Sequence, residues 1–307
     1  MAISIFRPSV SRPHHFLYSA NSINSQKFSS ISVTKKQSFL PCASADSATT
    51  RQEVSLCVGT YLIPHPNKVE KGGEDAFFVS SDNGRVIAVA DGVSGWAEKN
   101  VDPALFSREL MANVSSLVGN EEEVKYDPQI LLKGAHAATS SIGSATVIVA
   151  MFENGILKIA SVGDCGLRIV RKGQMIFSTF PQEHYFDCPY QLSSEAVTQT
   201  YLDAIISSVD MKEGDTIIMG SDGLFDNVFD QEIVSVMTTH DNVSNAAKAL
   251  AELAKNHSVD TKFDSPYSLE ARARGFDVPW WKKFFGMKLT GGKLDDITVI
   301  VGKVKSS

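Results

Sequence analysis

Continuous apolar runs recur along this chain, and several of them stop abruptly on an acidic residue. Runs of small and β-branched residues such as 86–90 and 216–219 are typical of strands that are buried on both faces. Short turn sequences such as "ENG" and "RKGQ" connect several runs, and strands joined so closely must be antiparallel. The pattern predicts strands at 54–63, 75–81, 85–91, 144–152, 155–163, 166–173, 174–179, 201–210, 215–222 and 296–304.

Apolar residues at helical spacing predict two pairs of helices between these strands. Asp102 and Asp127 are each followed by proline, which suits an N-cap and the first helical position. The second pair is expected at about 231–239 and 243–257. Alternating strand–helix–strand units and a phosphate-binding glycine motif are absent from the sequence, which disfavours a doubly wound nucleotide-binding fold. The pattern predicts an α+β fold of two stacked antiparallel β-sheets flanked by pairs of α-helices.

Acidic residues stand at the ends of the predicted core strands. One such residue is usually a cap or a turn former, but stacked sheets can bring several strand ends to one edge. Carboxylates gathered there would repel one another unless cations lay between them, and oxygen-only ligand sets suit magnesium or manganese. Gly92 would leave its backbone carbonyl accessible beside this site, and Gly223 would allow a tight turn. The acidic candidates are Glu74, Asp75, Asp91, Asp164, Asp222, Asp226, Asp295 and Asp296.

Six segments follow one another along the chain: "GGEDAFF", "VADGVSG", "GSATVIVA", "SVGDCGLRI", "GSDGLFDN" and "GGKLDDITVIV". In this order they resemble the motif series of metal-dependent type 2C protein serine/threonine phosphatases. The resemblance spans about residues 54–304. It implies that Asp91 bridges two Mn²⁺ or Mg²⁺ ions, that the Gly92 carbonyl binds one, and that Asp222 and Asp295 hold the other. These three aspartates are then the catalytic residues.

The same resemblance assigns the remaining acidic residues. Glu74 and Asp75 would join the metal site directly or through water. Asp164 and Asp226, together with Asp222, would match a weaker third metal site. Asp296 is expected to orient Asp295, and the alternative is a turn residue that opens the strand.

The sequence departs from the family pattern at two substrate-side positions. Val93 stands where many relatives have a histidine after Asp-Gly, and the cations nearest to Glu74 are Lys68 and Lys71 instead of an arginine. We expect Lys71, Val93 and His184 to contact the substrate, with His184 or water bound to metal protonating the leaving group. The alternative for His184 is a surface or core histidine.

The N-terminal segment differs from the rest in composition. Residues 1–44 contain five basic residues, many serines and no acidic residue, which is typical of an organelle transit peptide; a disordered basic tail is the alternative. We expect a chloroplast transit peptide at 1–45 and one catalytic domain at 50–305. Without the five basic residues, 24 basic face 35 acidic residues, a net charge of about −11, which disfavours nucleic acid as a partner.

Two irregular segments, 181–201 and 264–289, are rich in aromatic residues. The second lies in an insertion at about 258–292 that is expected on the substrate side, where it either binds phosphorylated tails at a membrane surface or completes the core. The finer pattern resembles plant chloroplast members of the family that act on photosystem II core proteins. The resemblance therefore implies phosphothreonine and phosphoserine of those proteins as substrates, in the stroma or at the thylakoid. The alternatives are other stromal phosphoproteins, small phosphoesters, or a non-catalytic metal-stabilised regulatory module.

Overall fold

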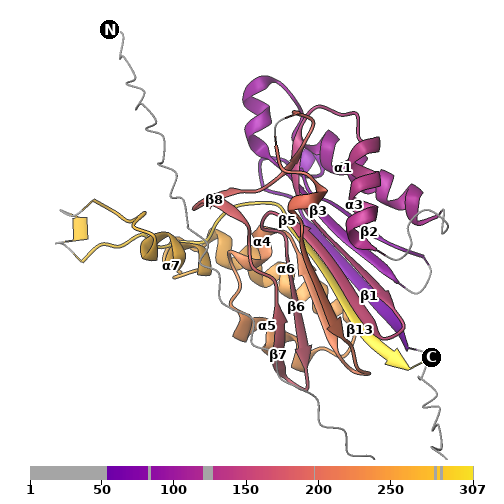
Figure 1. The fold of residues 1–307 in the computed structure, drawn as a ribbon. Helices are drawn as coiled ribbons and strands as arrows, with labels where there is room; N and C mark the ends of the chain where they lie inside the picture. Colours follow the sequence, from indigo (N-terminus) through magenta and orange to yellow (C-terminus); the bar gives the residue numbers. More distant parts are fainter. Residues whose placement is uncertain are drawn as a thin grey trace, which may run out of the picture. The chain divides into compact units, whose positions relative to one another are not determined.

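Two antiparallel β-sheets form the centre of the protein in a computed structural model, which describes residues 54–81, 84–119, 127–196, 198–279, 282–283 and 286–306 (Figure 1). The transit peptide expected at 1–45 lies outside the described residues. The first sheet has the order β1 (Val54–Ile63), β13 (Ile297–Ser306), β12 (Thr216–Gly220), β6 (Gly166–Arg171) and β7 (Gln174–Ser178). The second has the order β11 (Ile205–Asp210), β5 (Ile156–Val162), β4 (Ser144–Glu153), β3 (Val86–Gly92) and β2 (Ala76–Val79), with β10 (Leu192–Ser193) beside β4.

Helices cover the outer face of each sheet. α1 (Pro103–Val118) and α3 (Pro128–Ala138) pack on the sheet that contains β3 and β4, whereas α6 (Val243–Val259) packs on β1 and β13, with α5 (Asp230–Thr239) beside it (Figure 1). Asp102 and Asp127 cap α1 and α3, and their carboxylates accept hydrogen bonds from Ala104 N (3.2 Å) and Gln129 N (2.9 Å). The α+β fold predicted from the sequence is therefore confirmed.

The core has three apolar layers because the inner strands are buried on both faces. In β3, Ile87 and Val89 point toward the other sheet, whereas Val86, Ala88 and Ala90 point toward α1 and α3. In β12, Ile217 and Met219 lie between the sheets, and Ile218 faces α6. Continuous apolar runs in the sequence thus correspond to strands with two buried faces.

Short elements fill the connections. These are η1 (Val69–Lys71), η2 (Ser94–Lys99), β8 (Glu183–Tyr185), β9 (Cys188–Pro189), η3 (Tyr201–Asp203), α4 (Asp222–Phe225) and α7 (Pro266–Ala273). β8 and β9 pair as a hairpin inside the first segment expected to be irregular (181–201), and α7 lies inside the second (264–289). No helix in the part of the chain that the structure describes has the length and apolar character of a membrane span.

Gly223 allows the β12–α4 turn to pack directly against the backbone that enters β13. A Cβ at this position would collide with the backbone carbonyl of Asp296, and backbone cannot move aside as a flexible side chain can. This contact fixes the start of α4 relative to the start of β13.

We expect Gly223→Ala to lower the free energy of unfolding by about 1–3 kcal/mol or more, because the new methyl group overpacks a rigid contact. Gly95→Ala is the matched control, since a Cβ at Gly95 would meet nothing within 4 Å. Urea unfolding followed by circular dichroism measures both. Equal midpoints for the two variants would contradict the close packing at Gly223.

Candidate active site

Acidic residues from both sheets converge where the strands leave the core. Asp91 lies near the end of β3, Asp164 follows β5, and Asp222 begins α4 directly after β12. Asp75 precedes β2, and Asp295 precedes β13. Burial raises the pKa of Asp91 well above its usual range, and the charges of the other four carboxylates raise it further. The structure thus brings five of the residues predicted from the sequence into one cluster.

Gly92 lies where two other segments approach β3. A Cβ on Gly92 would lie 2.7 Å from the Pro103 carbonyl oxygen and 2.8 Å from the Glu74 carbonyl oxygen. The Gly92 N–H donates to that same Glu74 oxygen over 3.3 Å. Only glycine fits, so the segments that carry Glu74 and Asp91 can lie side by side.

Asp296 connects the start of β13 to the segment that carries Glu74 and Asp75. Its buried carboxylate accepts hydrogen bonds from the backbone N–H of His65 (2.7 Å) and of Glu74 (2.8 Å). Asp295 Oδ1 accepts from the Asp296 backbone N–H over 2.9 Å. The Asp296 side chain therefore supports the site by holding Glu74, whereas the sequence predicted that it orients Asp295.

Lys68 neutralises one end of the cluster. Its ammonium donates to Glu74 Oε2 (2.6 Å) and Ser94 Oγ (3.0 Å), and Ser94 Oγ donates to Glu74 Oε2 (2.6 Å). The same nitrogen lies 3.5 Å from Asp296 Oδ2 and 3.9 Å from Asp295 Oδ1. Lys68 is therefore the cation that belongs to the acidic cluster on this side.

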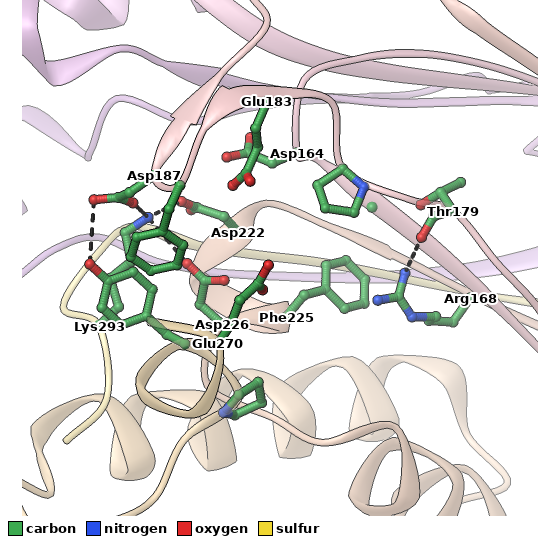
Figure 2. Close-up of a pocket in the computed structure, with 15 residues that line it drawn as sticks. Asp164, Arg168, Thr179, Glu183, Asp187, Asp222, Phe225, Asp226, Glu270 and Lys293 are labelled. Atoms are coloured by element: carbon green, nitrogen blue, oxygen red, sulfur yellow. Dashed lines mark hydrogen bonds and ion pairs between the residues drawn. The ribbon is translucent and has the colours of Figure 1, made fainter. Parts of the chain in front are cut away.

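Lys293 neutralises the other end, beside a cavity of about 200 Å³ (Figure 2). Its ammonium lies 2.6 Å from Asp222 Oδ2, 3.1 Å from Asp226 Oδ2 and 3.0 Å from Asp187 Oδ1. The cavity continues past Asp164 toward Arg168, which pairs with Asp230 over 3.0 Å. One lysine thus meets three carboxylates at the mouth of this cavity.

Most carboxylates of the cluster resist ionisation. Burial first, and the charge of Asp222 second, raise the pKa of Asp164 and that of Asp295 to about 7. Burial also raises the pKa of Asp75 and of Asp226 well above their usual range. Asp222 is the exception: burial raises its pKa, but the charge and hydrogen bond of Lys293 outweigh burial and lower it overall.

The cluster has the properties of a cation site. Asp75 Oδ1, Asp164 Oδ1 and Asp222 Oδ1 are buried and have no hydrogen-bond partner, which is costly for a carboxylate. Among the described residues, no three acidic, histidine or cysteine side chains are already arranged as a metal shell; Lys68 and Lys293 draw several carboxylates toward themselves. All available donors are oxygens, and this donor set fits Mg²⁺ or Mn²⁺.

Val93, Lys71 and His184, the three residues predicted to contact the substrate, each have different neighbours in the structure. Val93 follows Gly92 and lines a groove of about 250 Å³. The exposed Lys71 ammonium lies 3.7 Å from Asp102 Oδ2. His184 is exposed on β8, where its ring lies 4.5 Å from that of Tyr190 and its Nε2 lies 3.3 Å from Gln199 Nε2.

Sequence reasoning missed the roles of Lys293 and of Asn227, which holds it. Lys293 stands inside the quoted "GGKLDD" motif, two residues before Asp295, so its position in a motif was the available signal. Asn227 follows Asp226 directly and is fully buried. Asn227 also ends the quoted "GSDGLFDN" motif, but its hydrogen bonds to the distant Lys293 backbone are known only from the fold.

Comparison with known proteins agrees with the family resemblance seen in the sequence motifs. No protein-family model matches the chain. "Probable protein phosphatase 2C 1" of Oryza sativa subsp. japonica is 70% identical, over 83% of this chain and 77% of its own length. "Probable protein phosphatase 2C 26" of Arabidopsis thaliana is 66% identical, over 87% of this chain and 89% of its own length.

Two solved structures share the fold. The X-ray structure of the photosystem II phosphatase PBCP has a TM-score of 0.80 and 69% identity, and the match covers 82% of this chain and all of that one. The catalytic domain of the serine/threonine phosphatase PstP, solved with two manganese ions, has a TM-score of 0.57 and 19% identity, with 82% and 100% coverage. The sequence relatives are decisive, and the chain belongs to the protein phosphatase 2C family of serine/threonine phosphatases.

Proposed function

We propose that this enzyme removes phosphate from phosphothreonine and phosphoserine of photosystem II core proteins in the chloroplast, using two divalent cations. The proposed metal site rests on one observation: where the strand ends converge, several buried carboxylate oxygens have no hydrogen-bond partner. Asp91, the Gly92 carbonyl, Asp222 and Asp295 would hold the two ions. Glu74 and Asp75 would complete the site, and Asp164 and Asp226 are the residues that the resemblance assigns, with Asp222, to a weaker third ion.

Mn²⁺ or Mg²⁺ bound there would supply Lewis-acid chemistry, which lowers the pKa of water and offsets the charge of phosphate oxygens. The chain itself sets the geometry. Asp91 lies between the other carboxylates, Asp296 holds the Glu74 backbone, and Gly223 holds α4 against β13. Cys165 is no candidate nucleophile, because burial raises the pKa of its thiol well above its usual range.

Lys68 supports phosphate binding on one side of the cluster. Its ammonium is held at Glu74 and Ser94, within 4 Å of Asp295 and Asp296, so a phosphate entering the site approaches a positive charge that is already in place. Of the two nearby cations that the sequence offered, we assign the interaction with phosphate to Lys68, whereas Lys71 was the one expected to contact the substrate. Lys71 and His184, on their exposed segments, remain candidates for contacts with the protein substrate.

The groove beside Val93 suits the polypeptide around the phosphorylated residue. Trp96, Lys99, Ser144 and Gln191 also line it. The Trp96 indole donates to Ser144 Oγ over 2.6 Å, and Lys99 lies over the indole at 4.4 Å. A polar groove with one aromatic wall suits extended peptide better than it suits a small phosphoester.

The plastid location and the photosystem II substrate rest on two further observations. The N-terminal composition is typical of a transit peptide. The PBCP structure, described as that of a photosystem II phosphatase, shares 69% identity with this chain. Phe276 and Met287 are exposed in the segment that also carries Lys282 and Lys283, which suits peripheral contact with the thylakoid surface.

We expect Asp91→Asn to lower Mn²⁺-dependent hydrolysis of a phosphothreonine peptide by at least about 100-fold, since several kcal/mol of transition-state stabilisation depend on the metal site. Asp241→Asn removes a fully exposed carboxylate and is the matched control. Phosphate release measures both variants, before and after exhaustive chelation. Turnover that survives chelation would favour the alternative chemistry of a metal-independent phosphatase.

An assay on phosphorylated thylakoid membranes tests which phosphoproteins are substrates. The mature wild-type protein with Mn²⁺ should remove phosphothreonine from photosystem II core proteins faster than from other thylakoid phosphoproteins, followed by phosphothreonine immunoblots. Asp91→Asn is the control for contaminating phosphatases. Loss of signal from other phosphoproteins alone would refute the proposed substrate but not the reaction.

The stability of the metal-free protein should depend on pH in an unusual direction. The folded-state pKa values of Asp164 and Asp295 are about 7, above the ordinary 3.8, so between these pH values the folded protein binds more protons than the unfolded chain. The free energy of unfolding contributed by these groups therefore falls as pH rises through that window. Mn²⁺ binds the ionised carboxylates, so its stabilising effect should grow over the same window.

We expect Mn²⁺ to raise the melting temperature more at about pH 8 than at about pH 5, measured by differential scanning fluorimetry against EDTA. Asp164→Asn should weaken this pH dependence because it removes one of the carboxyl groups whose pKa the fold raises. An equal Mn²⁺ effect at both pH values would contradict the pKa assignment.

A further inference from the structure

Lys293 is held in place by its backbone as well as by its charge. Asn227 Nδ2 donates to the Lys293 carbonyl oxygen (2.8 Å) and to the Gly223 carbonyl oxygen (2.9 Å). Asn227 Oδ1 accepts from the Lys293 N–H over 2.9 Å. The preceding residue must be small, because a Cβ on Gly292 would lie 2.5 Å from Asn227 Oδ1. The loop therefore places the lysine at a defined position beside α4.

The ammonium lies against Asp222 and Asp226, in a cavity that Asp164 also lines. It contacts Asp222 Oδ2 and Asp226 Oδ2 at 2.6 and 3.1 Å, and its side chain is only 19% exposed. Figure 2 shows Asp222, Asp226 and Asp187 around this nitrogen, and Asp164 lines the same cavity. Asp222 Oδ1, by contrast, has no hydrogen-bond partner. The two oxygens of Asp222 therefore have different environments.

The two oxygens of Asp222 can therefore serve two different cations, a divalent ion and the Lys293 ammonium. A divalent ion of the catalytic pair can take Asp222 Oδ1 while Lys293 keeps Asp222 Oδ2. A third divalent ion in the pocket would need the carboxylate oxygens that the ammonium already contacts, and the two positive charges would repel at close range.

We propose that Lys293 is a built-in cation that stands in for a third divalent ion: it occupies the Asp164–Asp222–Asp226 pocket, leaves the catalytic pair undisturbed, and excludes a third ion from the resting enzyme. The inference rests on the proposed metal site. It also gives the ammonium a structural role, because the same nitrogen binds Asp187 at 3.0 Å and lies 5.4 Å from the Tyr267 ring of α7. A third ion would have to break these contacts.

Isothermal titration calorimetry of the metal-free enzyme with Mn²⁺ tests the proposal. Wild type should bind two ions, whereas Lys293→Met, which keeps the length of the side chain but removes its charge, should bind a third ion at least about tenfold more tightly than wild type does. Lys303→Met is the matched control, because Lys303 lies in a peripheral ion pair with the fully exposed Asp241, at 3.7 Å. It should titrate like wild type.

The outcomes separate the two proposals. A wild-type protein that binds no Mn²⁺ would overturn the proposed metal site, and the inference about Lys293 with it. A wild type that binds two ions and a folded Lys293→Met variant that titrates identically would overturn the inference alone.

A second measurement uses only wild-type protein, in case Lys293→Met fails to fold. Amine acetylation followed by mass spectrometry should find Lys293 protected in EDTA and at Mn²⁺ concentrations that fill two sites. Labelling should rise only when excess Mn²⁺ forces a third ion into the pocket, while Lys303 is labelled equally throughout. Labelling of Lys293 in EDTA as fast as that of Lys303 would refute the proposal.

Discussion

Repulsion among buried carboxylates governs how this fold is arranged around its acidic cluster. Asp75, Asp91, Asp164, Asp226 and Asp295 all have pKa values raised first by burial. Such a cluster is stable only if protons, lysines or metal ions neutralise it. Lys68 and Lys293 provide the fixed part of this compensation at opposite ends. The remaining negative charge is what gives the site its affinity for divalent ions.

The fold meets this constraint by gathering strand ends instead of burying charge within strands. β3 and β12 are apolar on both faces until the last residues, and the acids begin where the backbone leaves the core. Close backbone packing at Gly92 and Gly223 then brings segments of both sheets together. Stability and the proposed metal site are thus separated along β3 and β12: the apolar run holds the sheet, and the acidic residue near its end belongs to the acidic cluster.

The sequence predicted the strands and the acids well, because both are local signals. The strand predicted at 85–91 is Val86–Gly92 in the structure, and the helices that follow Asp102 and Asp127 begin as expected. Contacts between segments far apart in the sequence were harder to predict. Lys71 lies closer to Glu74 in the sequence than Lys68 does, yet the Lys68 ammonium contacts Glu74 and the Lys71 ammonium lies near Asp102. Asp296 binds the backbone 222 residues away at Glu74, which no periodicity encodes.

Lys293 shows why charge at such a site cannot be judged from acidic residues alone. Counting carboxylates predicts a third cation at Asp164, Asp222 and Asp226, yet one ammonium already lies against two of them. That ammonium lowers the pKa of Asp222 while the pKa values of its neighbours stay raised, so Asp222 is ionised before any metal arrives. In the proposed metal site, a lysine fixed by Asn227 would therefore prepare Asp222 as a ligand and block the adjacent position with the same charge.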